Sequence, residues 1–249
     1  MFTTEQIVIS IAWLCGGFIS GVSGIGGAMF AVPIAATFIP MHEVIALSCI
    51  LNVAMDTGIC VMQCRFCRLR AIIPMLAGTI PGSIAGLYIL KFMPGNVLQG
   101  GVGLLLLFYV WWQHASRKTK PHGESAPVGA AAGFAAGVLG TAISFDGPPV
   151  GAYGLYAGWP SRVFLGTISV FFVIRGALTC VLQGSAGFYT PTIINYALYG
   201  IPATFLGTLL AYPVTKHIPQ AVFRRVLKFV IAVAGAICLV RAFLPSTLA

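Results

Sequence analysis

The chain has 249 residues, of which 58% are hydrophobic and only 8% are charged. A soluble domain carries about 25% charged residues, so the composition excludes a sizeable soluble domain and indicates a polytopic α-helical membrane protein. The net charge of +9 does not indicate nucleic-acid binding, because most Lys and Arg residues lie in short loops between apolar stretches, as the positive-inside rule expects.

Five apolar segments are predicted in the first half of the chain, residues 1–113. The first two are short arms on either side of a glycine-rich break, at Gln6–Ser20 and Ala28–Ile39. Three full spans follow, at Val44–Met62, Ala71–Leu90 and Asn96–Gln113. A span of about 20 apolar residues crosses a bilayer, so the shorter arms suit either a re-entrant hairpin or two short spans.

The second half, residues 127–249, repeats this order after a polar linker at residues 114–126. Its arms are predicted at Val128–Leu139 and Pro148–Ala157. Its three spans are predicted at Val163–Leu182, Pro191–Ala211 and Ala221–Leu244. The linker is predicted to be cytoplasmic.

The two halves share an ordered series of glycine and proline residues. Gly17, Gly21, Gly24 and Pro33 recur at one constant spacing as Gly133, Gly137, Gly140 and Pro149. If each break is the tip of a hairpin, each half crosses the membrane three further times, and the second half is inverted relative to the first. Matching broken segments in two halves are the strongest sequence indication of a transporter's central site.

The loop charges give the orientation of this arrangement. Arg65, Arg68, Arg70 and most later basic residues fall on one side, which is the cytoplasmic side by the positive-inside rule. Only Lys91 and Arg241 fall on the other side. Both termini are therefore predicted to lie outside.

The residues of the two breaks are the candidates for substrate binding. In the first break they are Ser23, Gly24, Gly26 and Gly27, and in the second break they are Thr141, Ser144, Gly147 and Pro148. Glycine lets the backbone approach a ligand closely, and the helix that starts after each break directs its positive dipole end at the break. The alternative is that the glycines only allow close helix packing, which is the better interpretation for Gly17 and Gly133.

Three ionisable residues fall within the apolar segments, namely Asp56, Asp146 and Arg175. Asp56 and Arg175 occupy matching positions in the two halves, so they are predicted to form a structural ion pair, and Arg175 is also a candidate for binding substrate. Asp146 lies in the second break. It is either the group that couples transport to protons or a helix N-cap ahead of Pro148.

At these residues the chain resembles the TauE/SafE family of membrane proteins, described as sulfite or organosulfonate exporters. The first motif is residues 17–27 with Pro33, and the second is residues 133–140 with Gly147-Pro148-Pro149. Thr141–Asp146 depart from the compact second motif that is common in the family, so Asp146 is not a motif position. Gly24, Gly26, Gly27, Gly147 and Pro148 match motif positions. The resemblance implies export of a small sulfur-containing anion.

The function expected from the sequence is therefore secondary transport, not catalysis, with a small anion and protons as partners and no cofactor or metal. The size of the chain and this resemblance imply a bacterial inner membrane. A passive anion channel is the main alternative, and a thiol oxidoreductase using Cys64 and Cys67 is a third. Small-residue faces are compatible with a homodimer as well as with packing inside one chain.

Overall fold

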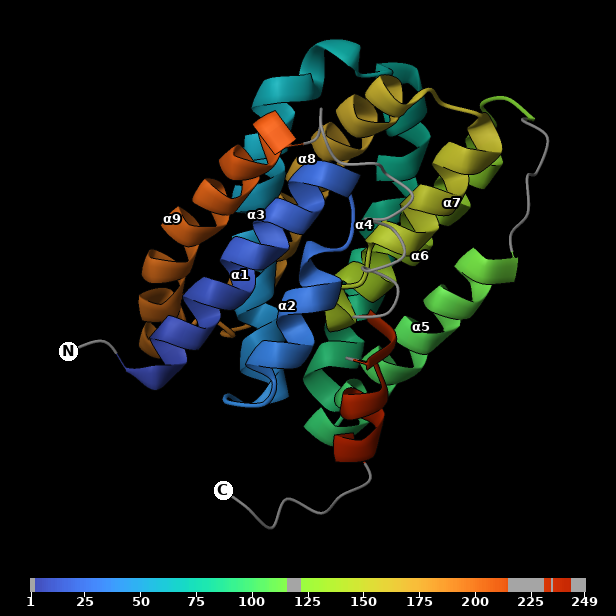
Figure 1. Cartoon of the computed structure of the whole chain (residues 1–249). Helices are drawn as coiled ribbons and strands as arrows, with labels where there is room; N and C mark the ends of the chain where they lie inside the picture. Colours follow the sequence, from blue (N-terminus) through green and yellow to red (C-terminus); the bar gives the residue numbers. More distant parts are fainter. Residues whose placement is uncertain (1–2, 116–121, 215–230, 234, 243–249) are drawn as a thin grey trace.

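The computed structural model describes residues 3–115, 122–214, 231–233 and 235–242, and these residues contain helices and no strand. The first half holds α1 (Thr4–Ser23), α2 (Gly27–Ala35), α3 (Met41–Gln63), the short 3₁₀ helix η1 (Cys64–Phe66), α4 (Leu69–Phe92) and α5 (Gly95–Ala115). The second half holds α6 (Ala126–Ile143), α7 (Gly147–Ala157), α8 (Ser161–Ser185) and α9 (Pro191–Val214). Figure 1 shows them as one helical bundle.

Six of these described helices are long and apolar enough to cross a membrane. They are α1, α3 continued into η1, α4, α6, α8 and α9. The polytopic all-helical class predicted from the sequence is therefore confirmed. Much of the predicted linker and of the last span, Ala221–Leu244, lies outside the described residues, as do the basic residues between 215 and 230.

The two arms of each break are unequal, which the sequence did not predict. The first arms, α1 and α6, have 20 and 18 residues and are both long enough to span. The second arms, α2 and α7, have only 9 and 11 residues. The breaks were predicted to begin at Gly21 and Gly140, but both glycines are helical, so the breaks shrink to residues 24–26 and 144–146.

The helices of the two halves pack in equivalent pairs. α1 packs along α9, and its counterpart α6 packs along α4. In the same way α3 contacts α9 and α8 contacts α4, while α3 and α8 contact each other. Figure 1 shows α1 beside α9 on one flank of the bundle. Each half therefore buries its first helix against the other half.

Glycines make these cross-half contacts possible. A Cβ atom on Gly17 would lie 2.4 Å from the carbonyl oxygen of Thr204, and one on Gly133 would lie 1.9 Å from that of Met75. Both distances are far inside van der Waals contact, so the helices approach this closely only with glycine present. The packing interpretation of Gly17 and Gly133 is confirmed. The same contacts occupy, within one chain, the small-residue faces that suggested a homodimer.

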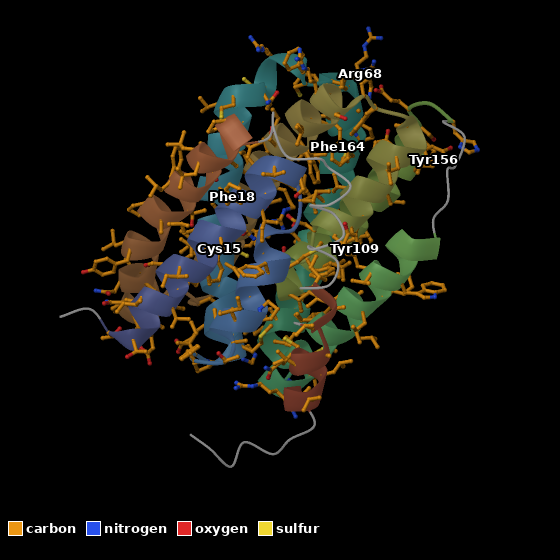
Figure 2. All side chains as sticks on the ribbon, in the orientation of Figure 1. Cys15, Phe18, Arg68, Tyr109, Tyr156 and Phe164 are labelled. Carbon is orange, nitrogen blue, oxygen red and sulfur yellow. The ribbon has the colours of Figure 1, made fainter. Side chains whose placement is uncertain are left out.

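One end of the bundle carries a group of arginines, and we call it the arginine end (Arg65, Arg68 and Arg162). The guanidinium carbons of Arg65 and Arg162 lie 4.9 and 5.7 Å from the centre of the Phe66 ring. Arg68 forms an ion pair of 2.9 Å with Glu124, and Figure 2 shows Arg68 at the tip of the bundle.

The two broken hairpins open at opposite ends of the bundle. The second hairpin opens at the arginine end, because Trp159, just after α7, donates a 2.9 Å hydrogen bond to Glu124, just before α6. The first hairpin opens at the other end, where Gln6 of α1 donates to Asn195 at the start of α9. The tips of both hairpins therefore point toward the middle of the molecule.

Candidate functional site

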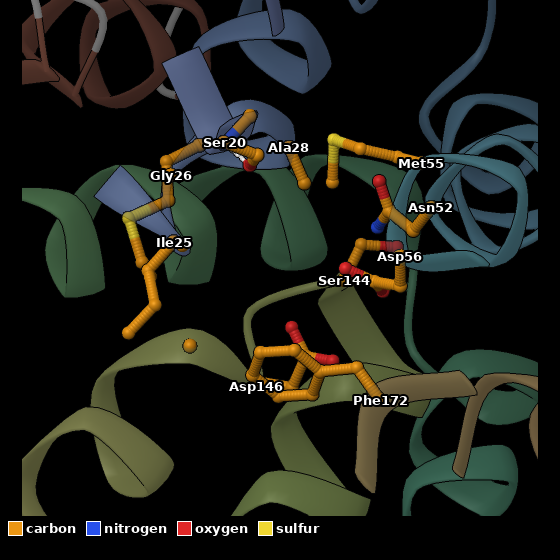
Figure 3. A pocket seen from close by; sticks show the side chains of 14 residues that line it. Ser20, Ile25, Gly26, Ala28, Asn52, Met55, Asp56, Ser144, Asp146 and Phe172 are labelled. Atoms are coloured by element: carbon orange, nitrogen blue, oxygen red, sulfur yellow. Dashed lines mark hydrogen bonds between the residues drawn. The ribbon is translucent and has the colours of Figure 1, made fainter. Parts of the chain in front are cut away.

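The two breaks line one cavity in the middle of the bundle. The rest of its wall comes from the adjoining ends of α1, α2 and α7 and from α3 and α8 (Figure 3). The lining residues are Ser20, Gly24–Met29, Asn52, Met55, Asp56, Ser144, Asp146, Gly147 and Phe172. The volume of about 20 Å³ is enough for one water molecule and too small for a sulfur oxyanion with three oxygen atoms. In this conformation the cavity therefore has no room for such an anion.

The first break is a tight glycine turn fixed by one serine. Gly24 and Gly26 have φ values of 77° and 113°, a region that only glycine enters at little cost. The Ser20 hydroxyl accepts a 2.9 Å hydrogen bond from the Gly27 amide, which is the first donor of α2. The next amides of α2 have no acceptor within their own helix, so the positive end of α2 faces the cavity.

Ser23 does not contribute its hydroxyl to this cavity. It donates a 2.8 Å hydrogen bond to the carbonyl oxygen of Ile19, one turn earlier, and also contacts the carbonyl oxygen of Ile25. The residue that offers a hydroxyl at the first break is Ser20. α1 continues to Ser23, and Ser20 lies on its buried face.

The second break has a different chemistry from the first. Ser144 adopts φ 59°, the one positive φ of a non-glycine residue in the described chain, and its hydroxyl contacts that of Ser48. Pro148 and Pro149 supply no amide hydrogen to the first turn of α7. The start of α7 therefore offers fewer donors to an anion than the start of α2 does.

Two other residues predicted at the second break do not line the cavity. Thr141 is fully buried within α6 and its hydroxyl lies 3.1 Å from that of Thr179 on α8. Pro148 also lies outside the lining, whereas Gly147 forms part of it. The helical course of α6 through Ile143 accounts for the position of Thr141.

Arg175 forms an ion pair with Asp146 directly beside the cavity. The guanidinium nitrogen Nη2 lies 2.7 Å from Oδ2 of Asp146, and the Arg175 side chain is only 1% exposed. Its Nε and Nη1 atoms are buried without a hydrogen-bond partner. Gly140 makes room for the guanidinium, because a Cβ there would lie 2.0 Å from Nη1. Asp146 stands at the N-cap position of α7, but its side chain makes no capping hydrogen bond.

The predicted ion pair between Asp56 and Arg175 is therefore wrong. Asp56 lines the same cavity but has no ion pair or hydrogen bond in the described part of the chain. The matching positions of the two halves did bring α3 and α8 together. However, the second break places Asp146 closer to the guanidinium, so the pair forms with Asp146 instead.

The cysteine pair of the third hypothesis lies far from this chemistry. Cys64 is exposed and Cys67 is half-buried at the arginine end, and both are free thiols. Within the described residues, no group of three or more His, Cys, Asp or Glu side chains could hold a metal ion.

Comparison with known proteins assigns the chain to a family. A family model described as "Sulfite exporter TauE/SafE" matches residues 9–237. The chain belongs to the TauE/SafE family. Membership implies a membrane transporter of sulfur-containing anions. No curated protein and no solved structure gives a significant match to the chain.

Several residues of this TauE/SafE cavity carried only weak signals in the sequence. Asn52 was a polar residue inside a predicted span, and Ser20, Met55 and Phe172 had no distinguishing pattern. Asn52 and Asp56 are one helical turn apart, so they share a face of α3, and that spacing is the one signal that could have placed Asn52 here. Ser20 becomes recognisable only once the end of α1 is known.

Proposed function

We propose that the protein is a secondary transporter that exports a small sulfur-containing anion, such as sulfite or a short organosulfonate, through the central cavity. The observation that carries the proposal is the buried Arg175, whose single ion-pair partner in the described chain is Asp146. A guanidinium offers a planar fork of donors that matches the oxygens of such an anion. Asp146 then occupies the place that a substrate oxyanion would take.

Substrate binding in this proposal requires Asp146 to release Arg175. The released guanidinium and the positive end of α2 would hold the anion between the two breaks. A proton on Asp146 removes its charge and releases Arg175, so Asp146 is the proposed site of proton coupling. Gly24, Gly26, Gly27 and Gly147 let the backbone approach the anion.

The small volume of the cavity supports a carrier in preference to a passive channel. A channel needs a continuous path, whereas about 20 Å³ admits no sulfur oxyanion. We propose that the two halves are inverted repeats that rock against each other, because their hairpins open at opposite ends of the bundle. The arginine end would face the cytoplasm of a bacterial inner membrane. An inside-negative potential then favours anion exit by about 2.3 kcal/mol per charge per 100 mV.

Anion flux in proteoliposomes tests this function. The panel is sulfite, sulfate, thiosulfate, sulfoacetate and acetate, measured with the wild-type protein and with Arg175→Met and Arg175→Lys. We expect saturable flux of a sulfur oxyanion or sulfonate that Arg175→Met abolishes and that Arg175→Lys retains in part, because lysine keeps the charge but loses the fork.

The matched control is Arg68→Met, which removes an arginine whose ion pair lies at the surface and should leave flux unchanged. Size-exclusion profiles and Tm values confirm that each variant is folded. Absence of flux for all five anions in a folded, oriented preparation would reject the proposal. Equal loss in both arginine-to-methionine variants would reject the specific role of Arg175.

A further inference from the structure

The cavity wall carries more negative than positive charge, which an anion site alone does not explain. Asp56 and Asp146 both line the cavity, and Arg175 is paired with one of them. With all three ionised, the described charged groups at the cavity sum to one negative charge. An uncompensated charge in the middle of a membrane protein is strongly unfavourable. Either a proton on Asp56 or a bound monovalent cation would remove this excess.

An unpartnered amide oxygen faces the same space. Asn52 is 4% exposed and its Oδ1 atom has no hydrogen-bond partner. Figure 3 shows Asn52, Asp56 and Ser144 together on one wall of the cavity, with Asp146 facing them. A buried acceptor without a donor is unfavourable. A cation would satisfy this oxygen and the Asp56 carboxylate at the same time.

The size and the donor set of the cavity select the class of cation. Its volume of about 20 Å³ takes a single particle the size of a water molecule. The groups around it are carboxylate, amide and hydroxyl oxygens, which are ligands for hard cations. One net negative charge matches a monovalent ion, and a non-titrating amide oxygen favours a metal cation over a proton on one carboxylate.

From these observations we propose that Asp56 and Asn52 form the core of a Na⁺ site in the central cavity, completed by oxygens of the two breaks. The site exists in the conformation in which Asp146 is paired with Arg175, so Na⁺ and the substrate anion bind in alternate conformations. Inward movement of Na⁺ would then drive outward movement of the anion. This last step rests on the proposed transport function, whereas Na⁺ binding itself does not.

Thermal unfolding of the purified protein in detergent tests the site directly. Tm is measured at fixed pH and fixed ionic strength while Na⁺ replaces choline, and again while K⁺ replaces choline. We expect a saturable rise in Tm with Na⁺ and a much smaller one with K⁺, because an ion that binds only the folded state stabilises it. Asp56→Asn should abolish the Na⁺ response, and Asn52→Ala should raise the half-saturating Na⁺ concentration about tenfold.

Ser83→Ala is the matched control, since Ser83 has a buried hydroxyl without a partner on α4, outside the cavity lining. Its Na⁺ response should equal that of the wild-type protein. Equal effects of Na⁺, K⁺ and choline on the wild-type protein would overturn the proposal, and so would a full Na⁺ response in Asp56→Asn. A stabilisation that depends on pH through Asp56 but not on Na⁺ would replace the Na⁺ site with a protonated carboxyl.

Flux measurements separate this inference from the proposed function. We expect sulfite to weaken the Na⁺ response and an imposed Na⁺ gradient to accelerate sulfite movement in the opposite direction. A Na⁺ response that needs Asp56, in a protein that moves no anion, would leave the cation site standing and reject anion transport. Sulfite flux that is indifferent to the Na⁺ gradient would reject the exchange.

Discussion

At the scale of single residues, the chemistry of the site depends on where one guanidinium is held. Arg175 is positioned by its ion pair with Asp146 and by the space that Gly140 leaves. The sequence predicted that an arginine and two aspartates matter, but it paired the wrong two. Matching positions in the repeat indicated correctly that α3 and α8 lie close together. The ion-pair partner of Arg175 depends instead on the course of the second break, which the repeat does not specify.

Substitution of Gly140 should displace the guanidinium without removing it. A Cβ atom there would lie 2.0 Å from Nη1 of Arg175, so in Gly140→Ala the side chain has to move away from Asp146. We expect at least a tenfold fall in anion flux, equivalent to about 1.4 kcal/mol. Gly101→Ala is the control, because a Cβ at Gly101 meets nothing within 4 Å. Normal flux in Gly140→Ala would show that the position of Arg175 is unimportant.

Asp146→Asn should separate anion affinity from turnover. The amide no longer competes for Arg175, so the apparent KM for a short sulfonate should fall roughly tenfold, while the maximal rate falls because release is slower. Flux should also lose its pH dependence. A sulfonate is the better probe here, because its own charge does not change near neutral pH.

Glu124→Gln serves as the control for Asp146→Asn, since Glu124 is a carboxylate at the arginine end that pairs with Arg68. It should keep the wild-type KM and pH profile. If Asp146→Asn also keeps the full pH dependence of the wild-type protein, Asp146 is not the coupling group.

At the scale of helices, the sequence predicted which segments exist but misjudged where the breaks begin. Gly17 and Gly133 were correctly assigned to packing, yet their neighbours were assigned to the breaks. The sequence alone does not distinguish a glycine that packs against another helix from a glycine that ends a helix. They differ only in what lies opposite them. The opposite helix, α9 for Gly17 and α4 for Gly133, belongs to the other half of the chain.

Gly133→Ala should weaken the contact between α6 and α4. The added Cβ would lie 1.9 Å from the Met75 carbonyl oxygen, and backbone cannot yield as a side chain can. Overpacking of this kind costs about 1–3 kcal/mol, so Tm should fall by several degrees. Gly101→Ala again provides the control, and an unchanged Tm in Gly133→Ala would contradict the close packing of these two helices.

At the scale of the whole molecule, the distribution of charge predicts the orientation in the membrane. The arginine end should face the cytoplasm, and Lys91, at the end of α4, should face outward. In a background without other cysteines, Cys64 should react with an impermeant maleimide only after the membrane is opened. Lys91→Cys in the same background should react in intact cells. The reverse pattern would invert the proposed orientation.

Cys64 is a better labelling site than its neighbour Cys67. Cys64 is exposed, whereas burial, with smaller contributions from Cys60 and Cys64, raises the pKa of the Cys67 thiol above its usual value. Because the thiolate is the reactive form, a raised pKa means less thiolate at neutral pH. Labelling of Cys67 should therefore be slow at pH 7 and accelerate as the pH rises.

The pairing of α1 with α9 and of α6 with α4 has a consequence for the synthesis and membrane insertion of the protein. α1 is made first, but the helix that covers its glycine face is made near the end of synthesis. For most of translation, the glycine face of α1 must therefore contact lipid or an insertion factor in place of α9. Neither half can complete its own core, so a ribosome that stops before α9 leaves a chain that quality control can recognise by an uncovered glycine groove.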